Sequence, residues 1–146
     1  MKRKEVRVAP RLQESVEKFL DENFRSKNFG AEYILTAWGP LYRRTLADLK
    51  GVFSRGELML LIDSFNSTML TPGLSGQHLL AHVEDSIDLD HLDEKWEVCR
   101  TELVAKVEAL PIFSRTAMEL WANGYWYGRP DDQDLPDLDG YVNAIL

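Results

Sequence analysis

A single short strand, with no second strand in the chain to pair with, is the feature that most constrains this fold. Residues 4–9, KEVRVA, alternate in polarity, which places Val6 and Val8 on one face. The opposite face is charged and carries Arg3, Glu5 and Arg7. Pro10 then favours a change from strand to helix, because it lacks a backbone donor and suits a first helical turn. An isolated strand leaves its backbone groups unpaired, so we expect the same strand of a second subunit to complete an antiparallel ribbon.

Two helices are predicted to follow the strand. The first spans residues 11–23, where apolar side chains recur at helical spacing at Leu12, Val16, Phe19 and Leu20. The polar segment FRSKNFG is expected to form a turn, with Ser26 and Asn28 as possible N-caps. The second helix, AEYILTAW, has one apolar face formed by Ile34, Ala37 and Trp38. Gly39 and Pro40 should end or kink this helix, and Pro40 can equally start the next one, which places a module boundary near residue 39.

Residues 40–124 predict a bundle of five helices, so we expect the fold class to be mainly α. Ser54 and Glu57 have the spacing of a capping box ahead of the helix ELMLLIDSFNSTML. Asp90 can cap a long helix, HLDEKWEVCRTELVAKVEAL, whose apolar residues repeat at spacings of three or four. Cys99 lies in the middle of that helix on its apolar face, which indicates an inert buried thiol.

The last predicted helix of the bundle begins at Pro111 and can close at Gly124. The tail that follows is too acidic and too rich in proline to form core. Its apolar end could still dock elsewhere, through Tyr141, Val142, Ile145 and Leu146. The sequence therefore predicts three regions, an N-terminal module, a helical domain and an acidic tail, at residues 1–39, 40–128 and 129–146.

Charge is distributed unevenly along the 146 residues, whose formal net charge is -7. Residues 1–50 hold eleven Lys or Arg against seven Asp or Glu, residues 51–128 hold five against twelve, and the last eighteen hold one against five. The balance argues against a general polyanion binder but leaves one basic end. A single cysteine indicates a reducing compartment, and no apolar run approaches the roughly 18 residues that span a bilayer. We expect a cytoplasmic protein without a membrane partner.

A two-stranded ribbon of this kind fits the major groove of DNA, where its charged face would meet base edges while Val6 and Val8 pack on the helices. The segment KEVRVAPRLQESVEKFLDENFRSKNFGAEYILTAW resembles the ribbon-helix-helix fold of the Arc and MetJ repressors and of many antitoxins. The matching features are the alternating basic strand, Pro10, the first helix, the turn from Glu22 to Asn28 and the helix start AEYIL. The resemblance covers about the first quarter of the chain.

The resemblance implies a role for each part of this module. The strand would contact DNA bases through Arg3, Glu5 and Arg7. The start of the second helix would hold a DNA phosphate by its backbone amides, near Asn28, Gly30 and Ala31. Lys2 and Lys27 are also expected to contact phosphates. The dimer core would consist of Val6, Val8, Leu12, Val16, Phe19, Ile34 and Trp38.

Two other groups of residues invite a functional interpretation. His78 and His82 stand four apart on one helix, but the acidic residues near them match no zinc or calcium motif, so we expect no metal site. The segment WANGYWYG is more typical of aromatic residues that close a helical core, and Trp126 and Tyr127 are the better candidates for a partner surface.

No glycine-rich phosphate loop, GxSxG motif or HExxH motif is present, so we expect neither enzymatic activity nor a cofactor. The sequence predicts a homodimer, or a higher even oligomer, that binds double-stranded DNA at specific sequences as a transcription regulator or antitoxin-like repressor. A protein partner of the helical domain or the acidic tail is a further expectation. The alternative is a non-enzymatic helical scaffold in which the N-terminal strand serves dimerisation alone.

Overall fold

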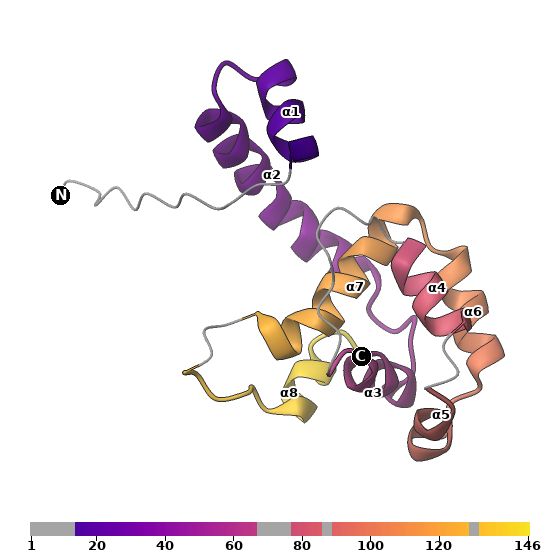
Figure 1. The fold of residues 1–146 in the computed structure, drawn as a ribbon. Coiled ribbons are helices and arrows are strands. Elements are labelled where there is room, and N and C mark those ends of the chain that lie inside the picture. Colours follow the sequence, from indigo (N-terminus) through magenta and orange to yellow (C-terminus); the bar gives the residue numbers. More distant parts are fainter. Residues whose placement is uncertain (1–13, 67–76, 86–88, 129–131) are drawn as a thin grey trace. The chain divides into compact units, whose positions relative to one another are not determined.

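The computed structural model describes residues 14–66, 77–85, 89–128 and 132–146 (Figure 1). Within these ranges it is mainly helical, as predicted, and its eight helices are α1 (Glu14–Asn23), α2 (Lys27–Asp48), α3 (Arg55–Ser64), α4 (Gln77–Asp85), α5 (Asp90–Trp96), α6 (Arg100–Ala109), α7 (Ile112–Tyr127) and α8 (Leu138–Asn143). The predicted strand at residues 4–9 lies outside the described residues. The chain divides into two compact units, Met1–Leu41 and Tyr42–Leu146.

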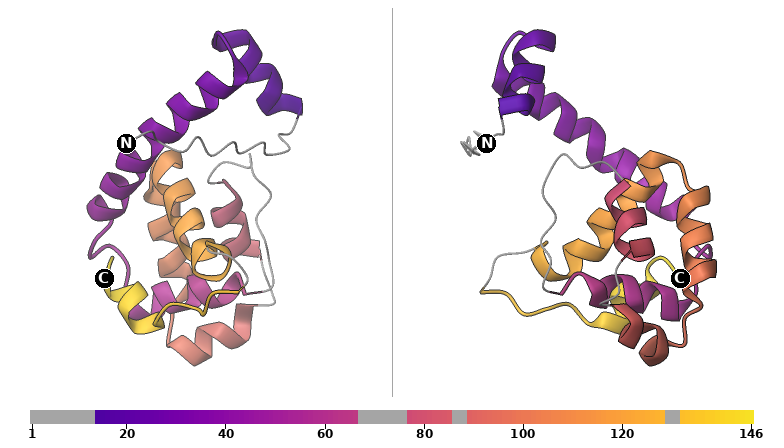
Figure 2. Two further views of the ribbon diagram at one scale, coloured as in Figure 1. Left: turned by 90° about the vertical axis from the view of Figure 1, so that its left-hand side faces the viewer. Right: turned by 45° about the vertical axis from the view of Figure 1, so that its right-hand side comes forward.

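In the first unit, α1 and the beginning of α2 form a helical hairpin (Figures 1 and 2). Ser26 is the N-cap of α2, as one of the two predicted possibilities: its hydroxyl oxygen accepts from the Phe29 amide at 3.1 Å, and its carbonyl accepts from the Gly30 amide at 3.0 Å. Gly30 is buried, and a Cβ there would lie 2.6 Å from the Phe24 ring and 3.0 Å from Leu20. The absence of a side chain at this position allows the hairpin to close.

The second helix does not end at Gly39 and Pro40, the first of the two predicted outcomes, because α2 continues through Pro40 to Asp48. Proline removes one backbone donor and crowds the preceding turn, at a cost of about 3 kcal/mol, but the hydrogen bonds on either side can hold. Beyond the proline, Thr45 and Leu49 are buried, with 8% and 4% of their surface exposed. This burial favours helix in the segment that follows Pro40.

The second unit has one hydrophobic core. The helix α3 packs against α5, α7 and α8, and α4 packs against α6 and α7, as Figures 1 and 2 show. The predicted capping box starts α3: the Ser54 hydroxyl accepts from the Glu57 amide at 3.2 Å, and the Glu57 carboxylate accepts from the Ser54 amide at 2.7 Å. The side chains that are fully buried include Leu58, Leu60, Leu61, Ile62, Phe65, Leu79, Val83, Leu103, Val107 and Met118.

The predicted long helix over residues 91–110 is broken into α5 and α6, and the prediction that it would be continuous was wrong. The break lies at Glu97, whose φ of 54° is left-handed. In an unbroken helix Leu92 and Leu103 would be about 16 Å apart along the axis. With the break, both enter the same core. Cys99, predicted to be buried, is instead exposed at the N-cap of α6.

The prediction that Asp90 caps the helix in this part of the chain was also wrong. Asp90 is the first residue of α5 rather than its N-cap, and its carboxylate accepts from the Arg100 guanidinium at 3.1 Å. Arg100 also bonds to Asp93 at 3.0 Å, so one side chain of α6 ties back to the first turn of α5. These contacts hold the two short helices together at the break.

The C-terminal end of the chain is part of the core, so the prediction that the acidic tail lies outside it is wrong, and the alternative that the apolar end of the tail docks elsewhere is the one observed. Val142 is fully buried and Ile145 is 5% exposed. The Tyr141 ring stacks on Trp121 at 5.2 Å, and its hydroxyl donates to the Trp121 carbonyl at 2.6 Å. The acidic side chain of Asp137 caps α8 by accepting from the Gly140 amide at 2.8 Å. Carboxylates therefore occupy caps and surface while the apolar side chains of the same segment are buried.

The helix α7 begins directly after Pro111, as predicted, but it passes Gly124 and ends at Tyr127. A glycine inside a helix costs about 1 kcal/mol relative to alanine. Tyr125, one residue later, is only 6% exposed and donates its hydroxyl to the Pro136 carbonyl at 3.1 Å. Burial of this ring outweighs the helix-breaking tendency of the glycine.

Candidate dimerisation and nucleic-acid interface

The first unit exposes most of its large apolar side chains. Among its described residues, 14–41, only Leu20 and Gly30 are buried. The exposed fractions are 37% for Val16, 50% for Phe19, 55% for Phe29, 61% for Tyr33, 38% for Ile34 and 69% for Leu35. Two helices with this little interior cannot stabilise themselves by hydrophobic burial, so the hairpin needs a partner surface.

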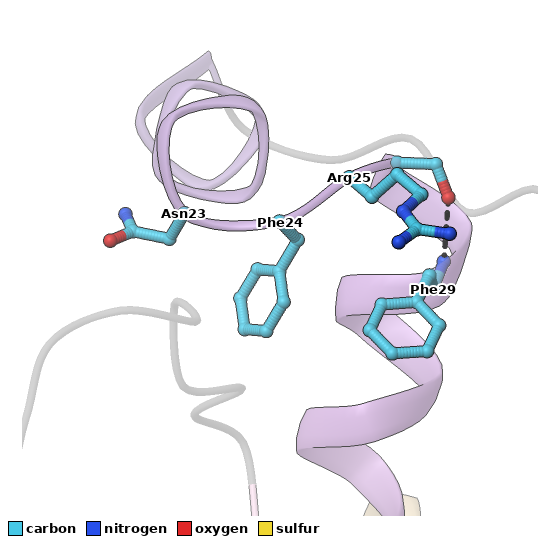
Figure 3. Close-up of a pocket in the computed structure, with 5 residues that line it drawn as sticks. Asn23, Phe24, Arg25 and Phe29 are labelled. Atoms are coloured by element: carbon cyan, nitrogen blue, oxygen red, sulfur yellow. Dashed lines mark hydrogen bonds between the residues drawn. The ribbon is translucent and has the colours of Figure 1, made fainter.

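Four aromatic rings form a continuous series along the hairpin. Neighbouring ring centres in the order Phe19, Phe24, Tyr33 and Phe29 are 6.2, 6.1 and 6.2 Å apart. Figure 3 shows the rings of Phe24 and Phe29 at the turn before α2 and in its first turn, beside an open hollow that they line with Asn23, Arg25 and Ser26. The side chain of Asn23 bonds back to the Phe19 carbonyl at 2.8 Å. The hollow is therefore lined by two aromatic rings and by three polar residues of the turn region.

The predicted dimer-core residues fall into two groups. Val6, Val8 and Leu12 lie outside the described residues. Val16, Phe19 and Ile34 are exposed on the hairpin, and Trp38 is half-buried. The three exposed side chains are thus available for contact with a second subunit, although the prediction that they form a dimer core stays a prediction.

The predicted base contacts, Arg3, Glu5 and Arg7, and the phosphate contact Lys2 also lie outside the described residues. The other predicted phosphate contacts are at the start of α2: Asn28 is exposed, Ala31 is half-buried and Gly30 is buried beneath Phe24. The backbone amides of Lys27 and Asn28 make no hydrogen bond to any described residue. Two donors are therefore available at the positive end of the helix dipole.

Lys27 does not extend freely toward solvent. Its ammonium group lies 3.4 Å from the Asp21 carboxylate and 4.0 Å from that of Glu17, both on α1. All three side chains are about half exposed, so each pair contributes little to stability. A phosphate that used Lys27 would compete with these two carboxylates.

Sequence reasoning missed Phe29, Tyr33 and Leu35 as surface residues. The sequence pattern places Phe29 in a turn, and the other two fit an ordinary amphipathic helix. The available signal was the occurrence of apolar side chains on more than one side of α2, which is unusual for a helix with water on one side.

The predicted partner surface at Trp126 and Tyr127 is largely occupied by contacts within the second unit. The Trp126 indole donates to the Ile62 carbonyl at 2.7 Å, and its ring meets Tyr125 edge-on at 4.9 Å. Tyr127 is 39% exposed and donates its hydroxyl to the Asn66 carbonyl at 3.2 Å. Both side chains help to hold α7 against the end of α3.

Two titratable groups of the second unit are strongly affected by burial. Burial raises the pKa of Glu119 from 4.5 to about 7, although a hydrogen bond from the Leu79 backbone at the start of α4 opposes this shift. Burial also raises the pKa of the Tyr42 hydroxyl to about 12. Glu119 lies on α7, and Tyr42 packs against the hydrophobic core of the second unit.

Metal binding and membrane insertion find no support in the described parts of the chain. There, no group of three or more His, Cys, Asp or Glu is placed to hold a metal ion, and no helix is long and apolar enough to cross a membrane. The His82 ring stacks on Phe65 at 4.6 Å. Comparison with models of protein families, with curated proteins and with solved structures finds no match to the chain.

Proposed function

We propose that the chain is a homodimeric, sequence-specific DNA-binding protein that acts as a transcription regulator or antitoxin-like repressor. The observation that carries the proposal is the exposure of Val16, Phe19 and Ile34 on a hairpin with only two buried residues among those described. A second copy of the same face would give the hairpin the interior that it lacks. In the ribbon-helix-helix family that the sequence resembles, the corresponding helices supply this interior.

Two further observations support DNA as the ligand of such a dimer. The amides of Lys27 and Asn28 at the start of α2 are available to a phosphate. Residues 1–13 carry five Lys or Arg against one Glu, whereas residues 14–41 carry three against five Asp or Glu. Within residues 1–41, attraction to DNA is therefore expected mainly from the segment that contains Arg3 and Arg7.

The dimer is tested with a matched pair of variants, Ile34→Asp and Ile112→Asp. Both isoleucines are exposed, by 38% and 53%, but only Ile34 lies on the hairpin face. In sedimentation equilibrium we expect the wild type and the Ile112→Asp variant to be dimers and the Ile34→Asp variant to be a monomer, because a carboxylate in the paired face would lose its hydration. A dimer that survives Ile34→Asp would place the subunit contact elsewhere.

DNA binding is tested by selection from random-sequence duplexes, followed by titration of the enriched site at two salt concentrations. We expect a site with two-fold or tandem symmetry that the wild type binds and the Arg3→Ala, Arg7→Ala double variant does not. Affinity should fall steeply as salt increases, since phosphate contacts release counterions. If the wild type is a dimer and the selection enriches no sequence, the DNA-binding function is refuted.

The second candidate function is that of a helical scaffold in which the hairpin serves dimerisation alone. It is favoured by one observation, the acidic surface of α1, where Glu17 and Asp21 engage Lys27. This surface would repel a nearby DNA backbone. A dimer that depends on Ile34 but binds no DNA at low salt would support the scaffold.

A further inference from the structure

The second unit is strongly acidic, with nine Lys or Arg against eighteen Asp or Glu in residues 42–146. Among its described cations, five are engaged within the unit. Their acceptors are Asp139 and Asn143 for Arg55, Asp63 for Lys95, Asp90 and Asp93 for Arg100, Glu57 for Lys106, and the carbonyls of Glu108 and Leu110 for Arg115. Pairing is thus the rule for the described cations of this unit.

Three cations depart from this rule, and they occur together. The side chains of Arg43, Arg44 and Lys50 are exposed and make no hydrogen bond or ion pair with any described residue. Asp48 stands one helical turn after Arg44, yet the two form no ion pair. Arg43 and Arg44 lie in the last two turns of α2, and Lys50 follows two residues after the end of that helix at Asp48. The result is a small basic cluster at the beginning of an acidic unit.

We propose that this basic cluster, Arg43, Arg44 and Lys50, binds the phosphate backbone of the same double-stranded DNA that the N-terminal module is proposed to bind. Arginine donates two parallel hydrogen bonds to phosphate oxygens, and lysine adds a point charge. The inference rests on the proposed DNA-binding function, because the cluster follows directly in the chain after the hairpin that would position the duplex.

Electrostatic repulsion explains why a duplex bound next to this acidic unit would require cations that are not paired within the unit. Duplex DNA carries one charge per about 1.7 Å of its axis, so an acidic unit tethered next to it experiences strong repulsion. Cations that are already paired within the unit cannot offset this repulsion without losing their own partners. The cations of the basic cluster can offset it, and they would bind phosphates without selecting a sequence.

The experiment measures binding of the full chain to a mixed-sequence duplex of about 30 base pairs by fluorescence anisotropy over a range of NaCl concentrations. It compares the wild type with the variant Arg43→Gln, Arg44→Gln, Lys50→Gln. The control removes the same charge from exposed cations that the structure pairs elsewhere, as Lys18→Gln, Arg55→Gln, Lys95→Gln. Circular dichroism verifies that both variants keep the helical content of the wild type.

We expect the slope of log affinity against log salt to become shallower by about 0.9 for each cation that no longer neutralises a phosphate, or almost 3 per chain. Between about 50 and about 200 mM NaCl, the decrease in affinity should then be about 40-fold smaller than for the wild type for each chain of the dimer whose cluster contacts the duplex. The control should keep the wild-type slope. Equal slopes for all three proteins, or equal changes in the cluster variant and the control, would refute the role of the cluster.

Two additional measurements separate this inference from the proposed function. If the Arg3→Ala, Arg7→Ala variant loses sequence preference while the cluster variant keeps the wild-type slope, the proposed function stands and the cluster inference fails. If the wild type binds no duplex at the lowest salt, both fail. Polyglutamate and unlabelled DNA are also compared, at equal total charge, as competitors for the labelled duplex. If they compete equally, the cluster binds acidic protein as well as DNA, and this too would overturn the inference.

Discussion

Replacement of Glu119 by glutamine is expected to change how the stability of the second unit depends on pH. Glu119 is 4% exposed on α7, and its carboxylate accepts a hydrogen bond from the Leu79 backbone. Burial raises the pKa of this group from 4.5 to about 7, so the folded protein holds a proton that the unfolded chain releases. The contribution to stability is fully present below pH 4.5 and is lost as the pH rises through about 7.

The magnitude follows from the size of the shift. A change from 4.5 to about 7 corresponds to about 3 kcal/mol, since each pKa unit is worth about 1.4 kcal/mol. Glutamine has nearly the same shape, keeps an oxygen that can accept from the Leu79 amide, and does not ionise. The Glu119→Gln variant should therefore match the wild type near pH 4 and exceed it by about 3 kcal/mol near pH 8.

Urea unfolding followed by tryptophan fluorescence measures this difference, because Trp121 lies on the same helix as Glu119. The free energy of unfolding is determined for both proteins between about pH 4 and about pH 8.5. Other groups titrate in both proteins, so the difference between the two curves isolates Glu119. A difference that stays constant over this range would refute the assignment of a buried, proton-holding carboxyl.

Three other substitutions test the packing of the second unit. Gly56→Ala would place a Cβ 2.3 Å from the Trp96 carbonyl oxygen, so the free energy of unfolding in urea should fall by about 2 kcal/mol or more. Lys106→Met removes the cationic partner of the Glu57 carboxylate, which is 4% exposed and bonded to Lys106 at 2.8 Å, and leaves the bond from the Ser54 amide; thermal unfolding should show a loss of about 3 kcal/mol. Val142→Ala opens a cavity at a fully buried site, and the same urea assay should show a loss of about 1 to 3 kcal/mol.

Each of these substitutions has a control at a less demanding position. A Cβ at Gly124 would meet its nearest neighbour at an ordinary 3.4 Å, so Gly124→Ala should be neutral or slightly stabilising. Lys95→Met leaves Asp63, whose side chain is 23% exposed, and should cost less than 1 kcal/mol by the usual weight of surface ion pairs, about 0 to 1 kcal/mol. Leu146 is 39% exposed, so its replacement by alanine should cost less than that of Val142. Equal effects in any variant and its control would contradict the packing described above.

Sequence patterns alone predicted only part of the candidate interface. Helical spacing identified Val16, Phe19 and Ile34 as an apolar face, and the structure leaves this face exposed on the hairpin. The same pattern did not identify Phe29 and Tyr33, because their exposure depends on how closely α1 approaches α2 at Gly30. That distance is a property of two helices together, and neither helix specifies it alone.

Local interactions account for what the sequence by itself determined. The mainly helical fold, the capping box at Ser54 and the start of α7 after Pro111 each depend on residues within about one helical turn. Such signals act through hydrogen bonds and backbone geometry that are already available to the isolated segment. They can therefore be recognised without knowledge of the remaining chain.

The tertiary structure decided where local preferences are overruled. The helix α2 continues through Pro40, the chain breaks at Glu97 despite continuous helical spacing, and the acidic C-terminal segment buries Val142. At Pro40 and Glu97 the free energy of burying side chains far apart in the sequence exceeds a local backbone cost of about 1 to 3 kcal/mol. Only the assembled core can supply that free energy, so no local sequence pattern predicts these departures.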